Sequence, residues 1–417
     1  MRRSNIQLPE PIPRVAGLDL LRAVAIVLVL FTHGPLPAEG ELPWLLDQLV
    51  RALKRGGWIG VDLFFVLSGF LVSGLLMREQ QQHGTVHVGR FLVRRGWKIY
   101  PPLAVFIAVM VVVNYVQRGY WPTDRLINQL LFIQNYRPGV QVHTWSLAVE
   151  EHAYLLIALA FGLSATIARR RSRAMRLRWI VWLFPVVAVL AMIGRARAAS
   201  VQPFDSYLHQ FPTHLRIDSL FIGVVIAYAY HYAPQATAGL IRRYRLPISI
   251  AGIALLLPAF IWPLETTPWV YSYGLATNYL GGALLLCAML GWSPGTSWGW
   301  RWLMAVGRHS YSIYLWHMAA YAVLVGVLTG RFTGKPAWDG PYPLHLGLYV
   351  AVAIGSGVLL SWCIEVPTLK LRDRLSPSRS GALREMPNGG ENHRPGGQEK
   401  LVSGSLGAQA GVGLGRS

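Results

Sequence analysis

Two side chains that a membrane span normally excludes lie in the first apolar segment of the chain. This segment, LDLLRAVAIVLVLFTHG, contains Arg22 and His33, eleven residues apart. On an α-helix with about 3.6 residues per turn, that spacing is roughly three turns, so both side chains lie on one face about 16 Å apart. Ionisable groups inside a membrane helix are costly and usually face the protein interior. The pair predicts a polar path through the span, with a snorkelling Arg22 and a helix-end His33 as the structural alternatives.

The histidine points to acid–base chemistry, and further polar residues are expected at its depth. A neutral imidazole is the usual general base near physiological pH, and a neighbouring carboxylate stabilises the imidazolium that forms. If the N-terminus is cytoplasmic, the residues that share the outer third of the membrane with His33 are Asp62, Glu150, Glu151, Arg216 and Asp218. Adjacent glutamates point about 100° apart on a helix and need separate partners. Arg216 with Asp218 is equally well interpreted as a structural ion pair.

A second polar group is expected at the cytoplasmic side. The segment FLVRRGWKIYPP places Arg94, Arg95 and Lys98 before the third span, with Pro101 and Pro102 in the first turn of its helix. The segment GRHSYSIYLWHM opens the ninth span with the polar residues Ser310, Tyr311 and His317. Basic side chains suit phosphate groups, although they are also typical topology charges, and a core hydrogen bond suits His317 as well as a ligand does. This arrangement predicts a reaction that takes a phosphate-bearing donor from the cytoplasm and acts on an acceptor outside.

The elements that must position these residues are apolar segments of membrane-spanning length. The 417-residue chain is 53% hydrophobic and only 14% charged, which is far less charged than a soluble domain. About twenty apolar residues suffice to cross the hydrocarbon core. The fold class is therefore an all-α membrane protein. We predict ten transmembrane helices, at residues 17–35, 58–77, 100–117, 145–163, 179–195, 214–232, 246–263, 271–291, 309–329 and 345–365.

Basic residues between the spans predict the orientation of the chain. The net charge is +20, and arginines and lysines gather in the loops that follow even-numbered spans. By the positive-inside rule, these loops and both termini are cytoplasmic. No nucleic-acid partner is expected, because the rule explains the basic composition and nothing resembles a groove-reading element. No metal site is expected, because Glu151-His152 lacks a second ligand at helical spacing.

One membrane domain accounts for most of the chain. Residues 1–16 form a short basic, proline-containing cytoplasmic lead, and residues 17–370 form the ten-span domain. Residues 371–417 are rich in glycine, serine, proline and charge. Such a composition cannot bury a core, so this cytoplasmic tail is expected to be disordered. Cys287 and Cys363 lie in predicted spans and are interpreted as ordinary small apolar residues.

Seven motifs recur in a recognisable order along the membrane domain. They are Arg22-x10-His33, GVDLFFVLSGFL, RRGWKIYP, WSLAVEEHAY, RIDSLFIG, SYSIYLWH and the Glu365-x-Pro367 ending. Each is weak alone, but together, over about residues 15–370, they resemble the acyltransferase-3 family of integral membrane O-acyltransferases. The basic motif departs from the family's usual Arg-x-x-Arg because its second member is Lys98, which keeps the charge but loses the bidentate fork.

The resemblance implies transfer of an acyl group, commonly acetyl, from cytoplasmic acyl-CoA to a hydroxyl. It implies that His33 is catalytic and that Arg22 is its supporting cation. The paired acidic motif corresponds to Glu150 and Glu151. The coenzyme is associated with the basic segment that contains Arg94, Arg95 and Lys98.

We therefore expect a multi-pass enzyme of the bacterial inner (plasma) membrane that acylates a cell-envelope or exported carbohydrate. Its partners would be the lipid bilayer, a glycan or small-molecule acceptor, and envelope-assembly proteins. Acylation of a small secondary metabolite stays open, as do direct transfer and an acyl-enzyme intermediate. A proton-coupled transporter or flippase of an envelope precursor is the alternative, since His and Glu inside spans also suit a proton relay; the lack of inverted repeats counts against it. A non-catalytic membrane sensor or scaffold is the third hypothesis.

Overall fold

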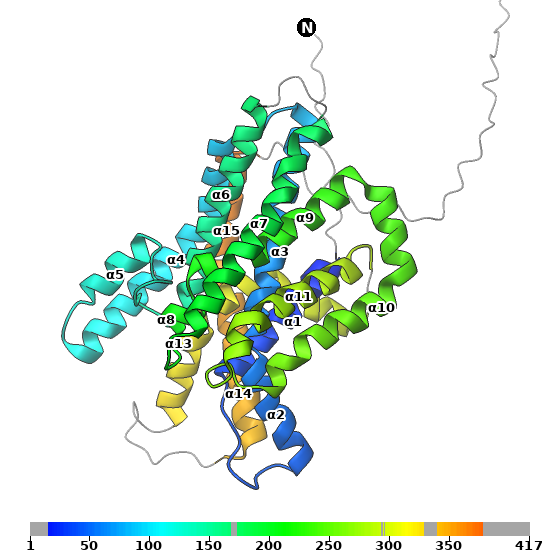
Figure 1. The fold of residues 1–417 in the computed structure, drawn as a ribbon. Helices are drawn as coiled ribbons and strands as arrows, with labels where there is room; N and C mark the ends of the chain where they lie inside the picture. The colour runs from blue at the N-terminus through cyan, green and yellow to red at the C-terminus, as the bar shows by residue number, and fades with distance from the viewer. Residues whose placement is uncertain (1–15, 168–172, 293–294, 296, 329–339, 378–417) are drawn as a thin grey trace, which may run out of the picture. The chain divides into compact units, whose positions relative to one another are not determined.

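The regular elements of the structure are helices throughout the part that is described. The computed structural model describes residues 16–167, 173–292, 295, 297–328 and 340–377. Residues 1–15 of the lead expected at 1–16 and the tail from residue 378 lie outside these residues, and Ala16 begins the first helix. Within them, the elements are α-helices with short 3₁₀ and π segments (Figure 1).

Each of the ten apolar blocks forms a helix. The ten are α1 (Ala16–His33), α3 (Ile59–His83), α4 (Val88–Arg118), α6 (Trp145–Ile167), α7 (Arg173–Ala199), α9 (Asp218–Tyr232), α10 (Pro234–Ile261), α11 (Leu275–Met289), α13 (Ser310–Leu328) and α14 (Tyr342–Leu360). Among the described residues, eight helices are long and apolar enough to cross a membrane. The helices α9 and α11 have 15 residues each, about 22 Å at 1.5 Å per residue, which is less than the hydrocarbon thickness. The count of ten spans and the orientation of the termini stay predictions.

Shorter helices occupy the connections between these elements. They are α2 (Trp44–Gly56), α5 (Thr123–Leu130), α8 (Ser206–His209), α12 (Trp298–Arg308) and α15 (Val366–Leu375). Residues 142–144 and 213–215 are 3₁₀ turns, and residues 270–274 and 361–365 are π-helical. The first five residues of the expected tail, 371–375, belong to α15, because this helix packs against α4 and its charged residues find partners there.

The position of the prolines in α4 corrects the sequence prediction. The helix begins at Val88, so Pro101 and Pro102 lie inside it and not in its first turn. Apolar content alone placed the start near residue 100. The basic turns before it are helical because neighbouring helices supply partners for Arg94 and Arg95. Consequently, Arg95 and Lys98 lie within the helix and not in the loop before it.

The helix α1 lies at the centre of the packing around the site. It contacts α2, α3, α11, α12 and α13 (Figure 1). Its neighbour α3 also packs against α9. The two helices are so close that a Cβ on Gly69 would lie 1.9 Å from the carbonyl oxygen of Leu220. Small residues at such interfaces let two backbones approach and gain dispersion contacts. The site is therefore supported by helices whose backbones approach each other closely.

The helix α10 has a kink that the block at 246–263 did not indicate. It begins at Pro234, and Tyr244 has non-helical dihedral angles of φ −115° and ψ 18°. Pro247 explains the kink, because a proline ring clashes with the backbone of the preceding turn and removes one hydrogen bond.

Candidate active site

His33 is the last residue of α1 and is half-buried. The helix ends here because Gly34 and Pro35 follow, and a proline cannot continue a helix. The ammonium of Lys54, on α2, donates to the carbonyl oxygens of Thr32 at 3.3 Å and Gly34 at 2.7 Å. Burial lowers the pKa of Lys54. The lysine therefore satisfies the free carbonyl groups on both sides of His33 and fixes this end of α1.

Three histidines from three elements meet beside this helix end. The ring centroids of His33 and His317 are 5.1 Å apart, and those of His317 and His143 are also 5.1 Å apart. His317 lies on α13, and His143 lies in the 3₁₀ turn before α6. Both are almost fully buried, at 0% and 4% exposure. His317 was expected in the polar group of the cytoplasmic side, but the structure places it against His33.

Backbone carbonyls determine which ring nitrogen carries the proton in the two buried histidines. Nδ1 of His317 lies 2.6 Å from the carbonyl oxygen of Tyr314, and Nε2 of His143 lies 3.2 Å from that of Leu315. A carbonyl oxygen only accepts, so each of these nitrogens is the donor in the neutral ring. Their second nitrogens, Nε2 of His317 and Nδ1 of His143, are buried with no hydrogen-bond partner among the described residues. Each presents a lone pair inside the protein.

A cavity of about 100 Å³ lies between α1, α3, α4, α6 and α13. Its apolar wall includes Phe64, Phe65 and Leu71. Its polar lining consists of Arg22, Ser68, Arg95, Lys98, Ser146, Glu150, Ser310, Tyr311 and Tyr314. The cavity thus combines three cations with an apolar wall, which suits an anionic ligand that carries an apolar arm.

Tyr314 connects this cavity with the histidines. Its ring centroid lies 5.6 Å from that of His143 and 5.8 Å from that of His317. Its hydroxyl donates to the carbonyl oxygen of His143 and lies 2.7 Å from Oγ of Ser146. Tyr314 therefore belongs to both the cavity wall and the histidine cluster.

Glu150 pairs with the basic motif and not with His33. Its carboxylate lies 3.8 Å from the guanidinium of Arg95 and accepts hydrogen bonds from the hydroxyls of Ser68, at 2.9 Å, and Tyr154. Arg95 also donates to the Tyr154 hydroxyl. The prediction that Glu150 lies in an outer layer and Arg95 in an inner layer is therefore wrong, because both side chains meet at one depth. The shift follows from the early start of α4, which carries Arg95 into the helix bundle.

Glu151 has a different partner, as the 100° rotation between adjacent helical residues requires. The hydroxyl of Tyr100 donates to its Oε2 at 3.1 Å. Its Oε1 is buried and has no hydrogen-bond partner within the described chain. Glu151 does not line the cavity, so the structure separates the two glutamates.

The remaining basic residues of the prediction take two different places. Arg22 lines the cavity and forms an ion pair with Asp19 at 3.0 Å. Lys98 also lines the cavity. Arg94 does not line the cavity and pairs with Asp373 of α15 at 3.0 Å. Only two of the three residues in the predicted anion clamp, Arg95 and Lys98, therefore face the cavity.

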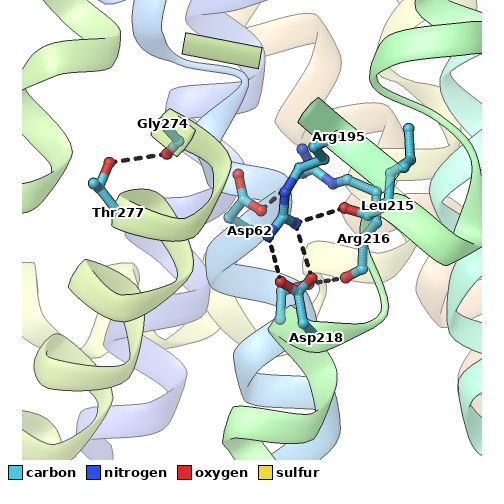
Figure 2. Close-up of polar contacts among 8 residues, drawn as sticks. Asp62, Arg195, Leu215, Arg216, Asp218, Gly274 and Thr277 are labelled. Carbon is cyan, nitrogen blue, oxygen red and sulfur yellow. Dashed lines mark hydrogen bonds and ion pairs between the residues drawn. The ribbon is translucent and has the colours of Figure 1, made fainter. Parts of the chain in front are cut away.

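Four fully buried charges form two ion pairs between α3, α7 and the start of α9, as Figure 2 shows. Arg216 pairs with Asp62 at 2.8 Å, and Arg195 pairs with Asp218 through two hydrogen bonds at 2.8 and 3.2 Å. All four side chains are 0–1% exposed. The expected pairing of Arg216 with Asp218 is replaced by these two pairs. Arg195 was missed, because an arginine at the end of an apolar block is typical of an interfacial charge.

Other polar residues near the site have structural partners. The hydroxyl of Tyr311 donates to the carbonyl oxygen of Ile99 at 2.8 Å, while Ser310 lines the cavity nearby. Glu365 accepts hydrogen bonds from Ser312 at 2.8 Å and Ser361 at 3.0 Å. Among the described residues, no group of three His, Cys, Asp or Glu is arranged to hold a metal ion.

Comparison with known proteins identifies the family that this chain matches. The family model described as "Acyltransferase domain" matches residues 15–365. "O-acetyltransferase OatA" of Staphylococcus aureus strain NCTC 8325 / PS 47 is 25% identical over 338 residues, which are 75% of this chain and 51% of that protein. "Putative O-acetyltransferase SACOL0978" of S. aureus strain COL is 25% identical over 333 residues, 73% of this chain and 50% of that protein. The chain thus spans about half the length of the curated relatives that it matches.

No solved structure matches this chain. The family match rests on the sequence, and it covers every helix from α1 to α14. The helices that bear the three histidines, the cavity cations and the two buried ion pairs all lie inside the matched segment. The chain belongs to the acyltransferase-3 family.

Proposed function

We propose that the protein is a multi-pass membrane O-acyltransferase that moves an acyl group, namely acetyl, from cytoplasmic acyl-CoA to a hydroxyl of a cell-envelope or exported carbohydrate. The observation that supports this most directly is the cavity itself. It contains Arg22, Arg95 and Lys98 and reaches Tyr314, which contacts the histidine cluster beside His33. The names of the relatives, which are O-acetyltransferases, support acetyl as the group transferred.

The cavity lining fits part of an acyl-CoA molecule. Arg95 is already engaged by Glu150 and Tyr154, and Arg22 by Asp19, so among the described residues Lys98 is the cavity cation best placed for phosphate or carbonyl oxygens of the donor. Phe64, Phe65 and Leu71 suit the apolar part of the pantetheine arm. A volume of about 100 Å³ is too small for the nucleotide, which would stay at the cytoplasmic end. The coenzyme supplies an activated acyl thioester.

His33 is the general base in this proposal. It removes the proton from the acceptor hydroxyl while the hydroxyl oxygen attacks the thioester carbonyl carbon, and it then returns the proton to the leaving sulfur. Its position at the end of α1, half-buried, is consistent with an acceptor that approaches from one side and a donor that arrives through the cavity from the other. The roles of Glu150 and Glu151 in the proposal are to hold Arg95 and Tyr100, respectively, since those are their contacts.

The test is a transfer assay with radiolabelled acetyl-CoA, the full chain in nanodiscs and a crude envelope glycan extract as acceptor. Wild type is compared with His33→Ala and with His87→Ala, a matched control whose exposed side chain lies in the loop between α3 and α4. We expect label in the extract with wild type and His87→Ala only. Transfer that persists in His33→Ala would refute the catalytic role. Absence of both transfer and coenzyme binding in wild type would instead favour the transporter hypothesis.

A further inference from the structure

The carboxylates near the site are all engaged by residues other than His33. Glu150 contacts Arg95 and Glu151 contacts Tyr100. Asp62 and Asp218 belong to the two buried ion pairs that they form with Arg216 and Arg195. A general-base histidine commonly needs a group that holds its tautomer and orientation. Another type of side chain must therefore orient His33.

His317 is the side chain with the geometry for this task. Its ring centroid lies 5.1 Å from that of His33. Two imidazoles joined by an N–H···N hydrogen bond have centroids about 5 Å apart, since the bond is roughly 2.9 Å and each ring adds about 1.1 Å. The two rings are at this separation but tilted by 46°, and the hydrogen bond itself is not formed in this structure, so it requires a rotation of the His33 ring. His317 is fully buried, and its Nδ1 is committed to the carbonyl oxygen of Tyr314. Its Nε2 is a lone-pair acceptor with no partner among the residues described.

An acceptor without a donor in a protein interior is costly, so this nitrogen is expected to have a function. His33 is the neighbouring side chain with an N–H to give, and it has no carboxylate or carbonyl partner within the described part of the chain. His143 is a less suitable acceptor, because it contacts the ring of His317 and not that of His33. Its bond to Leu315 instead secures the turn of α13 that holds His317.

We propose that His317 is the positioning residue of His33: its Nε2 accepts the N–H of His33, which holds His33 in one tautomer and leaves the other ring nitrogen free to accept the proton of the acceptor hydroxyl. The inference rests on the proposed function, in which His33 is the base. In this arrangement a histidine takes the orienting place that a carboxylate has in many hydrolases. The carbonyl oxygen of Tyr314 in turn fixes the tautomer of His317.

Two conservative substitutions separate this role from a packing role. In His317→Gln, the side-chain amide oxygen replaces the acceptor near the position of Nε2. In His317→Asn, the amide reaches only the position of Nδ1, so the bond to Tyr314 is kept and the acceptor for His33 is lost. We expect His317→Asn to lower kcat about 10²-fold, within the range that general-base catalysis contributes. We expect His317→Gln to stay within about tenfold of wild type. The KM for acetyl-CoA should not change in either variant, because His317 does not line the cavity.

The outcomes distinguish the inference from the proposed function. Transfer that survives in His33→Ala refutes the function itself. Loss in His33→Ala, together with equal kcat in the Asn and Gln variants, overturns the positioning role and leaves the function standing. A second readout uses wild-type protein and is independent of variant folding: ¹⁵N NMR of labelled histidine, with the His33 signal assigned by its loss in His33→Ala. One tautomer of His33 is the expected result, and a mixture of both would overturn the inference.

Discussion

Lys54 shows how one side chain outside the spans can control the position of His33. Its ammonium donates to the carbonyl oxygens on both sides of that residue. We predict that Lys54→Met lowers kcat for acyl transfer about tenfold, because each lost hydrogen bond is worth roughly 1 kcal/mol and the end of α1 is released. The measurement is the transfer assay at saturating acetyl-CoA.

The matched control for this prediction lies one residue away. Arg55 is on the same helix and also donates to backbone carbonyls, but these belong to Phe260 and Ile261 at the end of α10. Arg55→Met removes one positive charge, as Lys54→Met does, and should keep wild-type kcat. Equal losses in the two variants would mean that charge, and not the position of His33, is what the assay detects.

The contact partners of individual side chains could be predicted only in part from the sequence. The types and spacing of residues singled out His33, the paired glutamates and the basic motif. They did not show that Glu150 would meet Arg95 or that His317 would meet His33. Arg195 and Arg197 illustrate the reason: two arginines in GRARA are alike in sequence, yet the first is 1% exposed and the second is exposed. The difference depends on how α7 is rotated against α9.

The two buried ion pairs, Arg216–Asp62 and Arg195–Asp218, connect elements that are distant in sequence. Arg195 on α7 pairs with Asp218 on α9, at 0% exposure of both side chains. Removing one partner of a buried pair leaves an uncompensated charge, at a cost of about 3–5 kcal/mol. We predict that Arg195→Met strongly lowers the midpoint of thermal unfolding in detergent. The double variant Arg195→Met/Asp218→Leu should recover most of the loss, because apolar residues replace both charges. A double variant as unstable as the single one would contradict this account.

The basic segment of α4 contains adjacent arginines that serve different elements. Arg94 pairs with Asp373 and holds α15, whereas Arg95 lines the cavity. We predict that Arg94→Gln increases amide hydrogen exchange over Val366–Leu375 but leaves the KM for acetyl-CoA unchanged. Arg95→Gln should raise that KM, because it removes a cation from the cavity lining and leaves the Glu150 carboxylate without its ion-pair partner beside an anionic donor, and it should leave exchange in α15 unchanged. The reverse pattern would show that the roles of the two residues had been exchanged.

The orientation of the whole membrane domain is a prediction that labelling can test. Positive-inside reasoning places residue 39 outside and residue 82 in the cytoplasm, and both residues are exposed. Glu39→Cys and Gln82→Cys are made in a background with Cys287→Ala and Cys363→Ala. We expect a membrane-impermeant maleimide to label residue 39 in intact cells and residue 82 only after permeabilisation. Labelling of residue 82 in intact cells would reverse the topology and, with it, the direction of donor entry.

Several properties of this protein were determined by the sequence alone. They are its helical class, the presence of a helix at each of the ten apolar blocks and the residues that belong to its family motifs. These follow from local quantities, because the length and apolar content of a segment determine whether it forms a helix that can enter a bilayer. Only the tertiary structure decided that α4 begins at Val88, that Glu150 serves Arg95, and that three histidines meet at the end of α1. Such contacts depend on the rotation and axial shift of each helix against its neighbours, which the packing of the whole chain sets and no single segment encodes.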